Sequence, residues 1–237
     1  MRQRVSEMKT KAAFLAASYG ALYVLGRGAG STTKERRARL PGDDIVDRPS
    51  LTSNHAVTIG APPEAVWPWL VQVGWRRGGW YTSRWVDQLV FPANRPSADR
   101  ILREFQQIEV GDSIPDGPPE SGCGFVVAEL MPRAHLVLHS RTHLPRALLA
   151  RGAAISWTWA FVIEGLSGGH TRLVVRSRAR LRPRWLAALA QLLLVPADAV
   201  MARQMMRGIA ERAELRYAML EGQPKVPLRH REVVRIT

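Results

Sequence analysis

The sequence predicts an α+β fold in which an antiparallel sheet supports one long C-terminal helix. Three observations carry this prediction. Residues 155–181 alternate apolar and polar side chains as an antiparallel hairpin does, residues 57–74 read as a strand leading into an amphipathic helix, and residues 184–220 keep a helical pattern to the end. At 237 residues, the chain is long enough for one domain with extensions.

The domain is expected to begin near Asn54, with a strand over "NHAVTIGAP". A helix should start at Pro62 or Pro63, where a missing backbone N–H costs nothing. Pro68 then predicts a kink or break, costing about 3 kcal/mol unless packing offsets it. Such a kink would turn the neighbouring indoles, Trp67 and Trp69, to different sides.

The middle of the chain gives weaker signals. A second short helix is expected over "TSRWVDQLV", capped by Thr82 or Ser83, and a short strand from Ile108 to Ile114.

The second half is rich in strands, expected over "GFVVAEL", "HLVLHSR", "ISWTWAFVIEGL" and "HTRLVVRSRARL". In the last two, the period of two separates a dry face from a wet one. The dry face holds Ile155, Trp157, Trp159, Phe161, Ile163, Leu173 and Val175, and the wet face holds Arg172, Arg176, Arg178, Arg180 and Arg182.

The C-terminal helix is expected from Arg184 to Leu220, bent or restarted at Pro196. Its apolar stretch "WLAALAQLLLV" is too short to span a bilayer, which favours a buried segment. Beyond the proline, an apolar stripe at steps of four faces the sheet: Met201, Met205, Ile209, Ala213 and Tyr217.

Residues 12–26 form an uncharged run preceded by basic side chains, the layout of a membrane anchor or a signal peptide. About 20 apolar residues are needed to cross a bilayer, so a helix packed on its own domain is the third alternative. The chain therefore divides into residues 1–30 (apolar helix and candidate anchor), 31–53 (a linker rich in charge, Gly, Ser and Pro), 54–222 (the domain) and 223–237 (a tail). We expect a cytoplasmic protein, which the anchor alternative would attach to a membrane through the N-terminal helix.

The net charge of +14 comes from 34 basic and 20 acidic side chains. Such a charge can attract phosphates or anionic lipid headgroups. No nucleic-acid partner is expected, because no zinc finger, RNA-recognition signature or basic helical stripe accompanies it.

The sequence carries no phosphate loop, dinucleotide fingerprint, nucleophile elbow or zinc-protease motif, so no cofactor is expected. Cys123 lacks an obvious base nearby and reads as an idle thiol. The histidines His135, His139 and His143 would lie about 13 Å apart at each step along a strand, too far apart to share a metal.

The order of elements resembles the helix-grip arrangement of the SRPBCC or START-like superfamily, which includes lipid carriers, polyketide aromatases and cyclases. The residues that carry the likeness span about 50–222: "VTIGAPPEAVWPWLVQVG", "RGGWYTSRWVDQL", "IEVGDSI", "WTWAFVIEGLSGGHTRLVVRSR" and "GIAERAE". The resemblance implies a curved sheet gripping the C-terminal helix, with a cavity between them.

That cavity implies a ligand site walled by aromatic and methionine side chains, with two arginines at its rim. The candidate ligand-binding residues are Trp80, Tyr81, Trp85, Trp157, Trp159, Phe161, Met201, Met205, Arg76 and Arg77. Asp87 and Tyr81 are the candidates for acid–base catalysis.

Three functions remain open from the sequence. The first is non-catalytic binding or carriage of a hydrophobic small molecule or lipid. The second is a cyclase or aromatase working without a metal. The third is a protein-interaction module that uses the wet-face arginines Arg172, Arg176, Arg178 and Arg180 to dock an acidic partner, with a filled core instead of a cavity.

Overall fold

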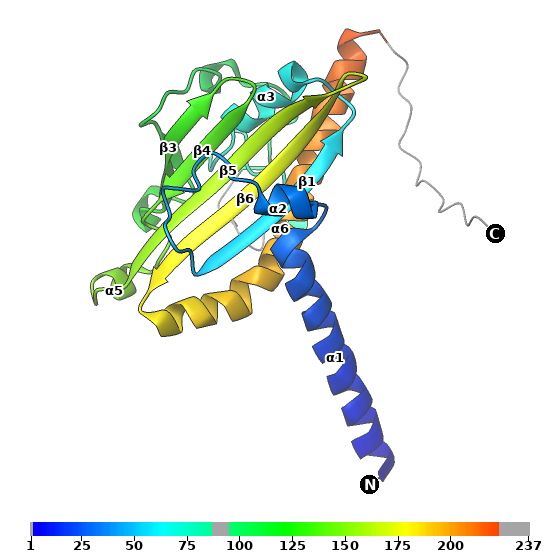
Figure 1. Cartoon of the computed structure of the whole chain (residues 1–237), viewed down its shortest axis with the longest axis vertical. Coiled ribbons are helices and arrows are strands. Elements are labelled where there is room, and N and C mark those ends of the chain that lie inside the picture. The colour runs from blue at the N-terminus through cyan, green and yellow to red at the C-terminus, as the bar shows by residue number, and fades with distance from the viewer. Residues whose placement is uncertain (1, 87–94, 223–237) are drawn as a thin grey trace, which may run out of the picture.

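The computed structural model describes residues 2–86 and 95–222. Its centre is a curved antiparallel sheet of six strands in the order β1-β6-β5-β4-β3-β2, so the first and last strands of the chain are neighbours (Figure 1). The strands are β1 (Leu51–Ile59), β2 (Ser113–Pro115), β3 (Gly124–Met131), β4 (His135–Ser140), β5 (Ala154–Leu166) and β6 (His170–Arg182).

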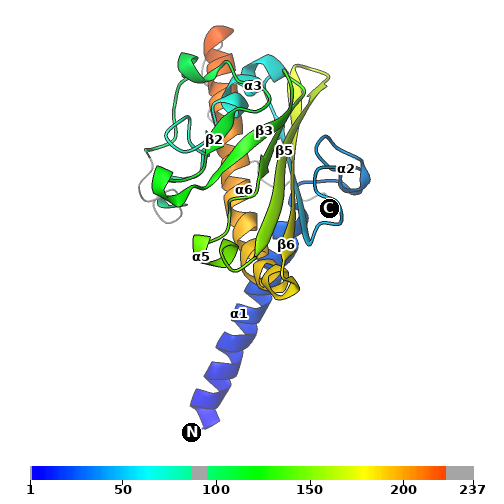
Figure 2. The same ribbon diagram turned by 90° about the vertical axis from the view of Figure 1, so that its left-hand side faces the viewer.

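The inner face of the sheet is covered by α3 (Pro63–Val71) and α6 (Arg184–Leu220). The outer face carries α2 (Thr33–Arg37), and Figure 2 shows the two layers on opposite sides of the strands. The long N-terminal helix is α1 (Arg2–Gly28). Short elements are α5 (Arg146–Leu149) and the 3-10 turns η1 (Arg103–Phe105) and η2 (Pro119–Ser121). The expected α+β fold, with a sheet curved around a long C-terminal helix, is confirmed.

The β5–β6 hairpin has the register that the alternation predicts. Trp157 pairs with Ala179 and Trp159 with Ser177, so the predicted dry face is the inner face. Residues along that face are buried, and they include Phe161 and Leu173. The hydrophobic core therefore lies between this hairpin and α6.

The strand expected from Ile108 to Ile114 is wrong over most of its length, because β2 begins only at Ser113. Residues 109–112 form a tight turn instead. The Glu109 N–H donates to Asp112 Oδ2 (2.8 Å), the Asp112 N–H donates to the Glu109 carbonyl (3.1 Å), and Gly111 has a φ of 100°. The carboxylate of Asp112 competes with strand pairing for the backbone.

α3 runs through Pro68 without a break and ends at Val71. Trp69 is buried in the core, whereas Trp67 is half-buried beside Gln106 and Leu130, so the two indoles face different sides as expected. Gln106 Nε2 donates to the Pro68 carbonyl (3.2 Å). The predicted second helix is helical over residues 84–86, and its remainder lies outside the described residues.

α6 is one helix through Pro196, and Figure 1 shows its first turns along the end of the sheet before it turns to cross the inner face. Asp198 Oδ2 lies 2.7 Å from Nε2 of the buried His55 and ties α6 to β1. α1 meets α6 near its own C-terminal end. There Tyr19 donates its hydroxyl to the Leu192 carbonyl (2.6 Å), and Gly26 is packed against the Val195 backbone.

Length and hydropathy identify one helix in the described part of the chain that could cross a membrane, and it is α6. The expectation placed the apolar segment at the N-terminus, so this assignment is a correction. The second half of α6 contributes Met205, Ile209 and Ala213 to the core. An apolar helix of this kind is equally typical of a soluble core, and a single one is weak evidence for a membrane span.

Residues 31–50, expected as a linker, lie across the outer face of the sheet as a strap (Figure 1). The strap begins with a capping box, in which Thr32 and Glu35 satisfy each other's backbone N–H groups. Gly42 N–H donates to Glu129 Oε1 on β3, and the strap residue Val46 is only 1% exposed.

Arg176 on β6 holds the strap in place, and it is only 3% exposed. Its guanidinium donates to Asn54 Oδ1 (2.7 Å) and Asp43 Oδ2 (2.6 Å). It also donates to the carbonyls of Glu35, Arg36 and Ala38 at the end of α2. Carbonyls at the C-terminal end of a helix lack helical partners, so Arg176 acts as the cap of α2.

Its neighbours on β6 bind the strap as well. Arg172 pairs with Glu35 (2.7 Å), Arg178 pairs with Asp43 (3.1 Å), and Arg180 donates to the Asp47 carbonyl (3.3 Å). This corrects the expectation that these arginines form an open docking surface. Their charges are satisfied by the chain's own residues, because the strap supplies both carboxylates and unpaired carbonyls.

Candidate functional site

A row of aromatic side chains follows the inner face of the sheet under α6. Trp159 lies at its centre, 5.2 Å from Phe161, 5.8 Å from Trp157 and 5.0 Å from Trp80 between ring centroids. Phe125 on β3 closes the row against Trp157 at 4.9 Å. Odd-numbered residues of β5 share one face, which is why the sequence W-T-W-A-F places three rings side by side.

The row gathers most of the predicted ligand residues. Trp80, Tyr81, Trp159, Phe161 and Met205 are buried in one cluster. Trp157 and Met201 are half-buried and are packed against it. The remaining candidates, Trp85, Arg76 and Arg77, lie outside the buried cluster.

Trp85 is 56% exposed. Arg77 is turned toward the chain and donates from Nε to the Val73 carbonyl and from Nη2 to the Val71 carbonyl, both at 2.9 Å. Its guanidinium lies 4.4 Å from the centre of the Phe105 ring, and burial lowers its pKa. Arg77 therefore caps the end of α3, while Arg76 is exposed and stacks on Trp75 at 4.5 Å.

Tyr81 has a structural environment. Its hydroxyl donates to the Trp69 carbonyl (2.9 Å), and burial raises its pKa above the ordinary value for tyrosine. The Tyr81 carbonyl lies against Gly208 of α6, where a Cβ would collide with it. The other candidate for proton transfer, Asp87, lies outside the described residues, and the catalytic roles of both stay predictions.

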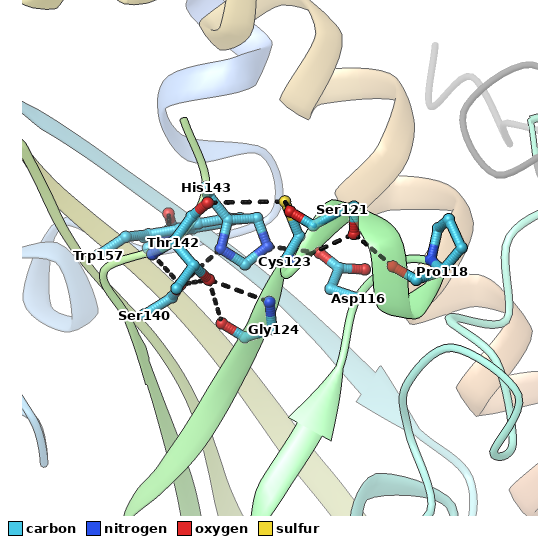
Figure 3. A network of polar contacts seen from close by, with 10 residues as sticks. Asp116, Pro118, Ser121, Cys123, Gly124, Ser140, Thr142, His143 and Trp157 are labelled. Carbon is cyan, nitrogen blue, oxygen red and sulfur yellow. Dashed lines mark hydrogen bonds and ion pairs between the residues drawn. The ribbon is translucent and has the colours of Figure 1, made fainter. Parts of the chain in front are cut away.

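A polar network lies at one end of the aromatic row (Figure 3). Asp116 Oδ2 is 2.8 Å from His143 Nε2, and His143 Nδ1 is 2.6 Å from Ser140 Oγ. A carboxylate accepts, so Nε2 carries the proton and Nδ1 accepts from the Ser140 hydroxyl. The imidazole is 4.5 Å from the Phe125 ring and 4.8 Å from the Trp157 ring, so the network continues the row.

Three connecting segments bring this network together. Asp116 follows β2 in the turn "PDGPP", Ser140 ends β4 on its inner face, and His143 lies in the loop between β4 and α5. Thr142 fixes that loop, because its hydroxyl exchanges two 3.1 Å hydrogen bonds with the Gly124 backbone. The Cys123 thiol lies 3.6 Å from the Thr142 carbonyl, at the edge of the same network.

Several buried polar atoms here have no hydrogen-bond partner among residues 10–86 and 95–222. They include Asp116 Oδ1 and the indole N–H groups of Trp69 and Trp80. Buried polar groups are usually satisfied, so unsatisfied ones in an aromatic interior are typical of a place where a polar ligand atom or water binds. The arrangement can therefore orient a molecule that is mostly apolar and carries a few acceptors.

The sequence pattern missed this network. His143 was expected in a strand with His135 and His139, but β4 ends at Ser140, and Pro145 two residues beyond His143 was the signal for that end. His139 lies on the outer face, where Nε2 is 2.9 Å from Ser156 Oγ and burial lowers its pKa. In the described part of the chain, no group of three His, Cys, Asp or Glu side chains is placed to bind a metal.

Comparisons with known proteins identify no family for this chain. No protein-family model matches the chain, and neither does any curated protein. Among solved structures, a Mesorhizobium loti protein is 15% identical with a TM-score of 0.43, covering 70% of this chain and 98% of its own. A hypothetical Helicobacter pylori protein is 12% identical with a TM-score of 0.47, covering 77% and 99%.

DynU16, a putative protein in the dynemicin biosynthetic locus, is 14% identical with a TM-score of 0.34 and covers 73% of this chain and 48% of its own. At this level of identity, the likeness concerns the fold alone.

Proposed function

We propose that the protein binds a mostly apolar small molecule or lipid between the inner face of its sheet and α6. The observation that carries this proposal is the continuous row of rings from Phe161 through Trp159 and Trp157 to His143, which ends in buried polar groups. Ligand sites typically combine apolar walls with a few polar groups that fix orientation. The row and its polar end have this composition.

The methionines of α6, which face the aromatic row, can adapt to ligands of different shapes. Met201, Met205 and Met206 of α6 contribute to the same cluster. Thioether side chains adjust to irregular shapes and contact aromatic rings favourably, so the wall can follow a flexible chain or a planar ring system. The indole N–H of Trp80, which has no hydrogen-bond partner among the residues that the structure describes, would donate to a carbonyl or hydroxyl oxygen of the ligand.

The rings are closely packed, so a ligand has to separate them. Three hollows in the described part of the chain lie on α1, over the arginines of the outer face and beside Trp67, away from the row. The half-buried members of the row, Trp157 and His143, lie where α5 and the first turns of α6 close the end of the sheet. We infer that a ligand enters at that end by displacing α5 or these turns.

Native mass spectrometry and thermal shifts against a panel of lipids and polyketides test the proposal. A bound panel compound should raise the melting temperature of the wild-type protein, because it binds the folded state. Trp157→Leu should reduce the shift by half or more. Trp85→Leu makes the same change at an exposed indole outside the row and should leave the shift intact. Absence of any bound species and of any shift across the panel would contradict the proposal.

A second function, proton transfer in a cyclase-like reaction, is favoured by the Asp116–His143–Ser140 contacts. The imidazole, oriented by the carboxylate, can take the hydroxyl proton of Ser140 at Nδ1 while the Ser140 oxygen takes a proton from a bound substrate, and the reverse transfers return it. His143→Gln and Asp116→Asn should each abolish turnover of a cyclising substrate while ligand binding persists. Full turnover in both variants would exclude this function and leave the binding proposal standing.

A further inference from the structure

The end of the molecule that carries α5 and the first turns of α6 exposes an unusual amount of apolar surface. Trp185, Leu189, Leu192 and Leu193 are 45–58% exposed and recur at helical spacing, so they form one stripe along α6. The opposite side of these turns, with Leu186, Ala187 and Ala190, is packed into the second core cluster. The stripe is therefore a face that the described part of the chain leaves exposed.

α1 extends this apolar surface away from the sheet. It joins α6 at Leu192 and Val195, and Figures 1 and 2 show its N-terminal part projecting beyond the domain. Phe14 and Val24 are 71% and 70% exposed, and Leu15, on another side of the helix, is 67% exposed. Within α1, residues 12–26 carry no charged side chain on any side. Such a run is stable when an apolar environment surrounds it, which a partner covering a single face does not provide.

Basic side chains frame the surface. Lys11, Arg27, Arg146, Arg151, Arg182 and Arg184 are all exposed around α1, α5 and the start of α6. The sequence has no acidic residue over residues 8–34, 130–163 or 165–197, which include these elements. A second copy of the chain would bring like charges together, whereas an anionic bilayer offers both an apolar interior and the opposite charge.

We propose that α1 and the stripe on α6 form a docking surface for an anionic lipid bilayer. The apolar run of α1, residues 12–26, spans about 22 Å as a helix, less than the roughly 30 Å of a hydrocarbon core. It therefore embeds in the bilayer without crossing it, while Trp185 lies at the level of the headgroups, where indoles concentrate. In this orientation, the end of the sheet with α5 and His143 faces the membrane.

Co-sedimentation of the full chain with vesicles tests the proposal. Vesicles of phosphatidylcholine mixed with phosphatidylglycerol should bind the protein at least about tenfold more tightly than vesicles of phosphatidylcholine alone, because each basic residue near an anionic surface adds to the attraction. The variant Trp185→Ser/Leu189→Ser/Leu193→Ser should lose most of this binding. The matched control, Leu215→Ser/Met219→Ser/Leu220→Ser, changes exposed apolar residues at the other end of the same helix and should bind as the wild type does.

Quenching of tryptophan fluorescence by brominated lipids gives a second measurement, which uses the conservative variant Trp185→Phe and so does not depend on destabilising the protein. These lipids should quench wild-type fluorescence more than that of Trp185→Phe, because Trp185 contributes an indole at the interface. The proposal is overturned if the wild type binds neither kind of vesicle, or if the stripe variant binds like the control. It is also overturned if the wild type forms an oligomer that does not bind vesicles and the stripe variant is monomeric. The stripe would then bind a second copy of the chain.

Discussion

Glu35 shows how one carboxylate couples the strap to the sheet. Arg172 on β6 donates to both of its oxygens, at 2.7 and 3.0 Å, and the Thr32 backbone N–H donates to Oε2 at 2.6 Å. These contacts favour the charged form and lower the pKa of Glu35 from 4.5 to about 2. The carboxylate therefore stays ionised in the folded protein at pH values where an unfolded chain would take up a proton.

The pH dependence of stability follows with a definite sign. Between pH 4.5 and about 2, the unfolded state binds more protons at this position, so the Glu35 contribution is complete above that window and is lost as the pH falls through it. Urea unfolding should show wild type more stable than Glu35→Gln at pH 6, with the difference disappearing towards pH 2.5. Glu104→Gln, on an exposed turn, should show no such trend, and a difference that grows in acid would refute the assignment.

Residue-scale prediction from the sequence succeeds where a side chain's neighbours are set by strand alternation. Trp157, Trp159 and Phe161 were expected on one face, and they lie there. His143 was missed because its contact with Asp116 joins two loops whose relative position depends on the whole sheet. A contact between two distant loops produces no periodic pattern of side chains in the sequence, so it could not be predicted from one.

At the scale of elements, the contact between α1 and α6 depends on a glycine. A Cβ at Gly26 would collide with the Val195 carbonyl, whereas one at Gly20 in the same helix would meet nothing within 4 Å. The close approach of the two helices therefore requires a residue without a Cβ atom, glycine, at position 26.

We expect Gly26→Ala to loosen this helix pair. Hydrogen exchange over residues 22–28 should become faster than in wild type, because the displaced helix loses the packing that protects its last turns. Gly20→Ala should leave exchange unchanged or slow it, since alanine favours a helix by about 1 kcal/mol over glycine. Equal exchange in the two variants would show that α1 is held by other contacts.

The elements that the sequence predicted well are those with a strong period: the hairpin of β5 and β6, the second half of α6, and the start of α3. The strap was read as a linker because its order comes from Arg172 and Arg176, about 130 residues later in the chain. The strand expected at 108–114 failed because Asp112 bonds to the backbone of its own turn. In each failure, a specific side-chain contact overrode the local pattern.

At the scale of the whole molecule, Arg176 joins the strap, β1 and β6 into one unit. Arg176→Met should lower the free energy of unfolding by about 3–5 kcal/mol, because it leaves the carbonyls of Glu35, Arg36 and Ala38 without this donor and removes one of the two guanidinium partners of the Asp43 carboxylate. Equilibrium urea unfolding measures the loss, and limited proteolysis should cut the released strap. Arg180→Met removes a single longer hydrogen bond and should cost far less; similar losses in the two variants would contradict the role of Arg176.

The neighbouring positions of β1 and β6 also impose an order on folding during synthesis. A ribosome delivers α1, the strap and β1 first, but their binding sites on β6 and α6 come from the last third of the chain. Contacts of such long sequence separation form late and slowly. The nascent chain must therefore carry an unpaired edge strand and an apolar helix until synthesis is nearly complete, which is the period in which it is most exposed to aggregation and to capture by chaperones.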